Sequence, residues 1–474
     1  MATVSGRRVV HTGMLLGGLL LGASCTPHGR AASAPASVPT NDRQAGRSEQ
    51  HAPISTLSAK TFRYRFAIYM ARAPAHLQQA LEEVAKKSSL RVTTQVIPLV
   101  PVPAETTIFV SDPPIESFAP PPMAELEYFS KGLNDAEKQQ LVASRAVLIF
   151  EVTGPGQRAL EDYRAALSFG RELAGRLGGF LWDEEARLAF TQASFQPRID
   201  SWQGSVPFVN YHVVLHEYRE GELLRIVSLG MVKFGLPDVA IDEVASTDAN
   251  RAGKLIDLVL QRLIEGAVPD ERGQFRASLD DVRQAEAKAW FGEDVLDNAN
   301  RSVVLLLAPT KPAKGDADNR LLAIQFPGDA GRLQERQAAT LDALFGSSST
   351  IVYLEHDAEL LAVSARARKR AFGLRARFAN GPPFGEVLLV KSPFATPKNG
   401  REWIWVEVVK WQNDTISGVL TEGAFDIPGL KEGARVDVKA SEIFDYMLVK
   451  KDGTREGNET EPLLEARAHR REKR

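Results

Sequence analysis

Acidic residues beside a tryptophan are the first group in this sequence with the chemistry for catalysis. Trp182 is followed by Asp183, Glu184 and Glu185, and a pair of carboxylates is what glycoside hydrolysis uses. Adjacent strand residues point to opposite faces of a sheet, so at most Asp183 and Glu185 are expected to cooperate. His356, which lies between two acidic residues, is a further candidate for acid–base work. The alternative is a solvated strand end for the carboxylates and a hydrophilic turn for His356.

A histidine pair and a glycine-rich turn are the motifs of the sequence that could bind a metal or a cofactor. His212 and His216 have the i, i+4 spacing that binds zinc on a helix, but a strand separates them by about 13 Å, so we expect one surface-facing row. Gly154-Pro155-Gly156 follows a strand and opens a helix, as in dinucleotide-binding proteins, but Pro155 removes one backbone donor and a simple turn is the alternative. The sequence therefore predicts no metal site and no cofactor.

The single cysteine, Cys25, is the second residue with reactive chemistry. Arg7 and Arg8 precede an apolar run at 14–21, which is too short to span about 30 Å of hydrocarbon and predicts a signal peptide. Gly22-Ala23-Ser24-Cys25 resembles the lipobox of bacterial lipoproteins, with Gly22 where a branched apolar residue is usual. The resemblance implies that residues 1–24 are removed and that acylated Cys25 anchors the chain to a lipid bilayer. An ordinary secretory signal, cleaved near Ala32-Ser33-Ala34, is the alternative.

Composition bounds the rest of the 474-residue chain. A hydrophobic content of 44% and a charged content of 25% are typical of a globular protein with an ample core. The formal net charge of -2 provides no overall field for nucleic acid, so no nucleic-acid partner is predicted. Residues 25–60 are rich in Ala, Ser and Pro and predict a flexible linker after the attachment site. Residues 463–474 predict a basic, disordered tail.

Hydrophobic periodicity predicts the elements that position these residues. Alternation over 62–70 predicts a half-buried strand, and apolar stripes predict helices at 74–87 and 157–177. Two strands joined at Glu220-Gly221 read as a hairpin. We expect a mixed α/β domain at 61–290, a small α/β segment at 291–360 and a small β-barrel-like domain at 361–462, within an α+β or mixed α/β class.

The C-terminal region carries the most specific pattern of the chain. Its motifs are a Glu402-Trp403-Ile404-Trp405-Val406 strand, a Gly418-Val419-Leu420 turn, Lys431-Glu432-Gly433, Ile443-Phe444-Asp445-Tyr446 and Gly457. This run resembles the YegJ-like bacterial domain (domain of unknown function 2314), with Tyr446 where tryptophan is commoner. Trp403, Trp405, Trp411 and Tyr446 form a candidate binding surface, and core packing is the alternative for Trp405 and Trp411.

A second resemblance lies in the middle of the chain, over about 145 to 270. The run Gly230-Met231-Val232-Lys233-Phe234-Gly235-Leu236-Pro237-Asp238, with Gly178 to Trp182 upstream, is similar to the signature of another uncharacterised bacterial family (domain of unknown function 4261). Neither resemblance implies a known activity.

These expectations combine into one functional hypothesis. The sequence predicts an exported lipoprotein of the bacterial cell envelope, anchored on the periplasmic or outer face, that binds an unknown protein or envelope ligand without catalysis. Two alternatives stay open, namely a glycan-directed hydrolase that uses Asp183, Glu185 or His356, and an immunity-like protein that covers the surface of a partner.

Overall fold

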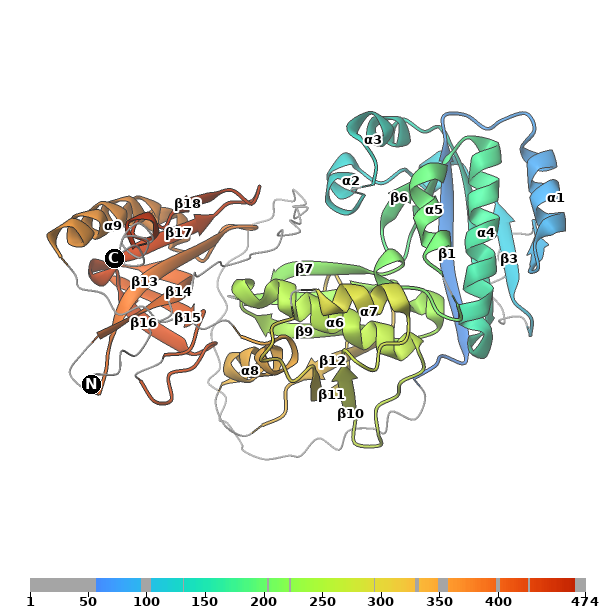
Figure 1. Cartoon of the computed structure of the whole chain (residues 1–474). Helices are drawn as coiled ribbons and strands as arrows, with labels where there is room; N and C mark the ends of the chain where they lie inside the picture. The colour runs from blue at the N-terminus through green and yellow to red at the C-terminus, as the bar shows by residue number, and fades with distance from the viewer. Residues whose placement is uncertain are drawn as a thin grey trace, which may run out of the picture.

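The described part of the chain folds into three six-stranded sheets with helices packed against them (Figure 1). The structure is a computed structural model and describes residues 57–94, 104–130, 132–202, 204–220, 223–293, 295–328, 332–347, 357–397, 401–424 and 427–464. The three sheets follow one another along the sequence. The predicted mixed α+β class is therefore confirmed.

The first sheet is built around the alternating strand that the sequence predicts, and its strands lie in the order β2-β3-β4-β1-β5-β6. Its elements are β1 (Thr61–Met70), α1 (Leu77–Lys87), β2 (Arg91–Thr93), β3 (Thr107–Ser111), η1 (Ile115–Ser117), α2 (Met123–Phe129), α3 (Asp135–Val142), β4 (Ala146–Pro155), η2 (Gly156–Arg158), α4 (Ala159–Leu177), β5 (Phe180–Asp183), β6 (Leu188–Phe190) and α5 (Gln192–Asp200). Phe62, Tyr64 and Phe66 of β1 belong to the same core cluster as α4, whereas Ala67 and Tyr69 pack with α2 and α3 on the opposite face. The period of two buries one face along the strand, and the other face is exposed at Thr61 and Arg63 and buried from Ala67 onward.

The middle sheet has the strand order β10-β11-β12-β9-β8-β7. Its elements are η3 (Val209–Tyr211), β7 (Val214–Glu220), β8 (Leu223–Leu229), η4 (Met231–Phe234), β9 (Asp238–Val244), η5 (Ser246–Asp248), α6 (Ala249–Ile264), β10 (Gln274–Ser278), α7 (Ala285–Gly292), β11 (Ser302–Thr310), β12 (Leu321–Gln325) and α8 (Leu333–Phe345). β7 and β8 pair antiparallel, as the hairpin prediction requires. β10 pairs with β11. These strands lie before and after residue 290, where the sequence predicts one region to end, and the structure places both in one sheet.

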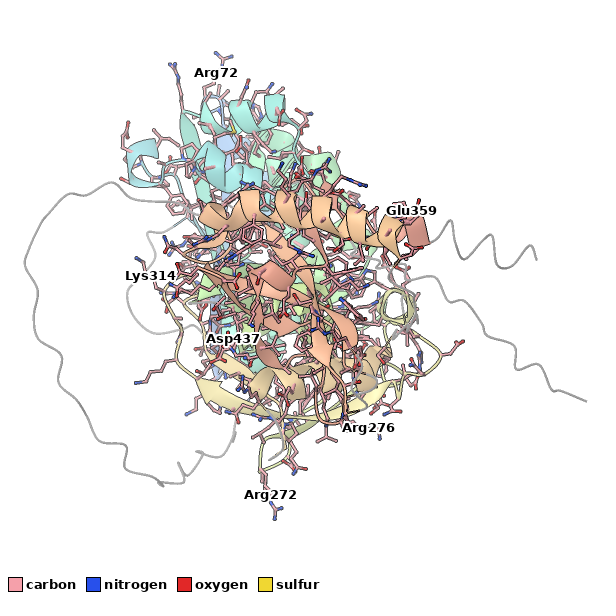
Figure 2. All side chains as sticks on the ribbon, turned by 90° about the vertical axis from the view of Figure 1, so that its left-hand side faces the viewer. Arg72, Arg272, Arg276, Lys314, Glu359 and Asp437 are labelled. Atoms are coloured by element: carbon pink, nitrogen blue, oxygen red, sulfur yellow. The ribbon has the colours of Figure 1, made fainter. Side chains whose placement is uncertain are left out.

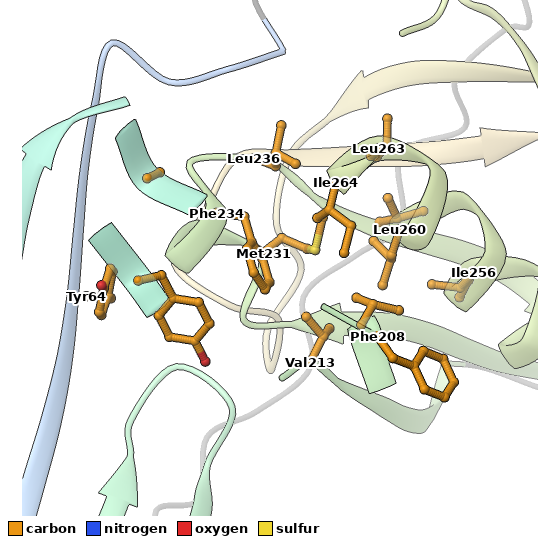
Figure 3. Close-up of a cluster of buried hydrophobic side chains, with 14 of the residues drawn as sticks. Tyr64, Phe208, Val213, Met231, Phe234, Leu236, Ile256, Leu260, Leu263 and Ile264 are labelled. Atoms are coloured by element: carbon orange, nitrogen blue, oxygen red, sulfur yellow. The ribbon is translucent and has the colours of Figure 1, made fainter. Parts of the chain in front are cut away.

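One continuous core joins the first two sheets. Tyr64 of β1 lies near the η4 residues Met231 and Phe234, and Ile256 and Leu260 of α6 lie beyond them (Figure 3). Apolar side chains of both sheets are therefore removed from water together, which ties the two sheets into a single body.

The C-terminal region forms an open sheet, and the predicted barrel is not confirmed. Its strands lie in the order β16-β15-β14-β13-β17-β18, and the outer strands β16 and β18 do not pair with each other. Its elements are α9 (Ala358–Phe378), β13 (Val387–Ala395), β14 (Arg401–Gln412), β15 (Thr415–Leu420), β16 (Arg435–Lys439), η6 (Ala440–Glu442), β17 (Asp445–Val449) and β18 (Arg455–Gly457). Helix α9 packs on one face of this sheet, where it shares a core with β13, β14 and β17. Because a helix covers that face, the sheet buries its apolar side chains without closing on itself.

Polar contacts fix the C-terminal sheet to the middle sheet. The Glu407 carboxylate on β14 accepts hydrogen bonds from the backbone N–H groups of Ser246 and Thr247, at 3.0 Å each, where η5 leads into α6. Arg251 of α6 pairs with Asp342 of α8 and with Glu432, both at 2.6 Å. Glu407 therefore satisfies donors of the middle sheet from a strand of the C-terminal sheet.

Candidate functional site

The residues around Trp182 separate into two environments because β5 alternates its faces. Trp182 packs with Tyr69 of β1 on the α2–α3 side of the first sheet. Asp183, one residue later, is fully buried on the opposite side. Glu184 follows β5 and lies, like Trp182, on the α2–α3 side. Asp183 and Glu184 consequently meet different partners.

Asp183 is bound inside the protein by two cations. Its Oδ2 atom lies 2.5 Å from Nζ of Lys233 and 3.3 Å from the guanidinium of Arg198. Its Oδ1 atom accepts a hydrogen bond from the backbone N–H of Ala186 at 3.1 Å. Both cationic side chains are buried. The carboxylate is thus neutralised and hydrogen-bonded, as a buried charge must be.

Aromatic and imidazole groups surround this ion pair. The Lys233 ammonium also donates to the backbone carbonyl of His212 at 2.7 Å, and Nδ1 of His212 lies 3.2 Å from the Tyr163 hydroxyl. Burial lowers the pKa of His212 well below its usual value, and the nearby cations lower it further, so the ring is neutral. His212 is fully buried, which corrects the expectation that it belongs to a surface-facing row. The cluster holds the first sheet to the middle sheet and presents no reacting group to solvent.

Two of the three predicted polar-site residues, Asp183 and Glu185, fall within the described residues. Glu185 lies near Asp183, and burial together with the Asp183 charge raises its pKa to about 7. His356 lies outside the described residues. Because Asp183 is fully buried in its ion pair, it is not placed to act on a substrate.

A pocket of about 320 Å³ lies on the other side of β5. Its lining consists of aromatic and proline side chains and three charged groups: Tyr69, Phe118, Ala119, Pro120, Pro121, Pro122, Glu125, Trp182, Glu184 and Arg187. The Tyr69 hydroxyl donates to the backbone carbonyl of Ala119 at 3.1 Å, which holds the proline segment against β1. Apolar walls with a few polar groups are typical of small-molecule sites, and the volume is at the lower end of their range.

The charged groups of the pocket are two carboxylates and one guanidinium. Burial raises the pKa of Glu125, and the positive charge of Arg187 opposes that effect. Burial also raises the pKa of Glu184, which lies 3.5 Å from the Arg65 guanidinium. Ionised carboxylates only accept hydrogen bonds, so the pocket suits a ligand that carries several donors.

Neither Asp183 nor Glu185, the described residues of the predicted polar site, lines this pocket. Trp182 and the acidic run were singled out, but the cooperating carboxylates were expected to be Asp183 and Glu185. Glu184 shares the pocket with Glu125 instead, because it projects to the same side as Trp182. The Pro-rich segment at 113–123 was the available signal for the opposite wall, since three consecutive prolines form a stiff surface.

The four aromatic residues of the predicted C-terminal surface do not share one environment. Trp411 and Tyr446 are fully buried in the core beneath α9, so burial removes them from that surface. Trp403 and Trp405 are half-buried. The Lys391 ammonium lies 5.4 Å from the centre of the Trp405 ring, and Trp403 packs against Phe444. Only Trp403 and Trp405 remain as candidates for an exposed contact.

The described helices and side-chain groups were compared with what a membrane span or a metal site requires. Within the described part of the chain, no helix has the length and hydrophobicity needed to cross a bilayer. Within the same part, no three His, Cys, Asp or Glu side chains are grouped as metal ligands. Cys25, the predicted attachment site, lies outside the described residues.

Comparison with known protein families gives a match in the C-terminal region. Residues 382–472 match a family described as an uncharacterized protein conserved in bacteria (DUF2314). No curated protein and no solved structure matches the chain. The resemblance of the middle region to a second uncharacterised family stays a prediction. The segment from β13 to beyond β18 is thus similar to a bacterial family of unknown activity, as its motifs predict.

Proposed function

We propose that this protein is an exported bacterial lipoprotein that binds a ligand at the membrane without transforming it. Acylated Cys25 anchors the chain on the periplasmic or outer face of the cell envelope, and the pocket beside Trp182 takes the ligand. The match of residues 382–472 to a family conserved in bacteria supports a bacterial setting, in which the lipobox-like run before Cys25 has its usual meaning.

The observation that carries the binding role is the separation of the two sides of β5. Asp183, one of the acidic residues considered for catalysis, forms ion pairs with Lys233 and Arg198 inside the protein. The pocket on the other side is lined by the half-buried ring of Phe118, by the buried rings of Tyr69 and Trp182 and by hydrogen-bond acceptors. Such a site binds through stacking and hydrogen bonds and needs no activated nucleophile.

The ligand class that fits this chemistry is a saccharide of the cell envelope. Sugar rings offer C–H faces that pack on aromatic side chains, and their hydroxyl groups donate to carboxylates such as Glu125 and Glu184. The two carboxyl groups with raised pKa values also favour one alternative, a glycan hydrolase that uses Glu125 and Glu184 as its acid and base.

Calorimetric titration with soluble peptidoglycan disaccharides tests the proposal. The wild-type protein should bind them, and Glu184→Gln should weaken binding about tenfold because it removes a charged acceptor. Glu271→Gln, at an exposed position outside the pocket, is the matched control and should leave the dissociation constant unchanged. Absence of binding, or equal binding by wild type and Glu184→Gln, would contradict the proposed site.

The same mixtures distinguish the binder from the hydrolase. After prolonged incubation with glycan strands, a binding protein leaves the number of reducing ends unchanged. New reducing ends that disappear in both Glu125→Gln and Glu184→Gln would replace the binding role with a hydrolytic one.

A further inference from the structure

Among the described helices, α9 carries a marked excess of basic over acidic residues. Its 21 residues include the six basic residues Arg366, Arg368, Lys369, Arg370, Arg375 and Arg377, with Glu359 as the one acidic residue. The formal net charge of the whole chain is -2. The basic character of this helix is therefore a local feature.

One side of α9 packs on the C-terminal sheet and the other faces outward. The packed side consists of residues three, four or seven apart, namely Leu360, Ser364, Ala367, Ala371 and Phe378, all of which are buried. Such spacing places them on one side of a helix with 3.6 residues per turn. Figure 2 shows α9 lying across the face of the molecule that is turned to the viewer.

Two large apolar side chains of α9 are partly exposed, and the ring of one of them, Phe372, also packs against the buried Trp411 with 5.8 Å between ring centres. Leu361 is 50% exposed and Phe372 is 38% exposed. They are separated by eleven residues, or three turns, so they lie about 16 Å apart along the helix. Ala365, four residues after Leu361 and seven before Phe372, lies between them on the same side of the helix, beside the half-buried Arg368.

The cations of α9 differ in how far they are neutralised. Arg370 pairs with Glu459 at 2.9 Å, and Arg377 pairs with Glu386. Arg366 and Lys369 are exposed and form no ion pair within the described residues. We call Leu361, Arg366, Lys369 and Phe372 the basic face of α9.

The chemistry of this face selects one occupant. Apolar side chains flanked by Lys and Arg are the arrangement by which an amphipathic helix lies at the level of lipid headgroups. A second copy of the same face would bring like charges together. Nucleic acid would use the cations but would leave Leu361 and Phe372 exposed to water.

The proposed anchor brings a bilayer within reach of α9. The 31 residues between Cys25 and Leu57 span at most about 100 Å when extended. A lipid attached at Cys25 therefore keeps the folded part of the chain close to the membrane surface, where weak contacts gain from high local concentration.

We propose that the basic face of α9 docks on an anionic lipid surface, with Leu361 and Phe372 inserted among the headgroups. This inference rests on the proposed anchor only for the choice of a bilayer as occupant. Docking would add a second attachment to the lipidated cysteine, and two attachments give more stable membrane binding than one.

Sedimentation with lipid vesicles tests the docking separately from the anchor. The protein from residue 26 onward, which keeps every described residue and has no acyl group, is mixed with vesicles of phosphatidylglycerol and phosphatidylcholine or of phosphatidylcholine alone. It should sediment with the anionic vesicles and stay in solution with the neutral ones. Each Lys or Arg near an anionic lipid surface contributes favourable binding free energy. Arg366→Glu combined with Lys369→Glu should therefore lower the vesicle partition coefficient at least about tenfold.

Matched variants separate the face from total charge and from folding. Leu361→Gln should weaken binding with no change of charge. Arg72→Glu combined with Arg272→Glu makes the same charge change at two exposed positions far from α9 (Figure 2) and should bind as wild type does. Circular dichroism melts confirm that each variant is folded.

Several outcomes would overturn the inference. One is the absence of sedimentation with either vesicle. Another is equal loss of binding in the α9 and control pairs, which would indicate attraction by total charge alone. Binding to duplex DNA in place of anionic vesicles would assign the face to nucleic acid. None of these results changes the saccharide titration. The lipid-docking proposal can therefore be wrong while the saccharide-binding proposal holds, and the reverse.

Discussion

At the scale of single residues, the contact between Asp183 and Lys233 decides how the acidic run near Trp182 is used. Both side chains are fully buried, and their charged atoms lie 2.5 Å apart. A buried pair of this kind contributes little net stability, but loss of one partner leaves an uncompensated charge. The position of Asp183 is therefore set by folding energetics.

Replacement of Asp183 tests this structural role. Asp183→Asn removes the counter-ion of Lys233 and Arg198 and should lower the free energy of unfolding by about 3–5 kcal/mol in guanidinium titrations. Asp280→Asn is the control, because Asp280 pairs with Arg301 at the surface and exposed pairs contribute at most about 1 kcal/mol. A loss for Asp183→Asn as small as that for the control would mean that the buried cluster does not depend on this carboxylate.

At the scale of elements, one carboxylate links the C-terminal sheet to the start of α6. Glu407 is buried on β14, and it accepts from Ser246, from Thr247 and from the Thr247 hydroxyl. Hydrogen bonds to charged groups contribute about 1.5–3 kcal/mol each when buried. The attachment of the two sheets should accordingly weaken when this side chain is shortened.

Hydrogen exchange measures that attachment directly. Glu407→Ala should speed exchange of the Ser246 and Thr247 amides at least about tenfold, since their acceptor is lost. Glu442→Ala, at an exposed position of the same sheet region, should leave both amides protected. Unchanged protection in Glu407→Ala would show that other contacts hold the interface.

Several elements were predictable from local pattern. The alternation in β1 predicts two faces, and Asn134 is a residue type that caps helices, because its side chain can accept from the first turn. The structure confirms a capping box between Asn134 and Glu137. Signals of this kind lie within a few residues, so they are readable without knowledge of the fold.

Other elements depend on contacts distant in sequence. β1 lies between β4 and β5, and no local pattern specifies that order. α9 was missed because its buried stripe is mostly alanine and serine, which gives a weak periodic signal. The pocket was not predicted from the sequence, since bringing Glu184 near Glu125 requires α2 and β5 to meet.

At the scale of the whole molecule, the proposed ligand pocket and the proposed membrane-docking face lie on separate elements. The first sheet carries the pocket, the middle sheet shares its core, and the C-terminal region presents the basic face of α9. Membrane attachment depends on the proposed anchor at Cys25. A body held at the bilayer by its N-terminus would then meet the lipid surface through α9 and keep the pocket for an envelope ligand.

Metabolic labelling with radioactive palmitate tests the central claim, attachment through Cys25, most directly. Cells that express the wild-type chain and the Cys25→Ser variant are labelled, and equal amounts of immunoprecipitated protein are compared by autoradiography. The account predicts label on the wild-type chain and none on Cys25→Ser, because Cys25 is the single thiol of the sequence. A wild-type chain without label, or label that persists in Cys25→Ser, would contradict it.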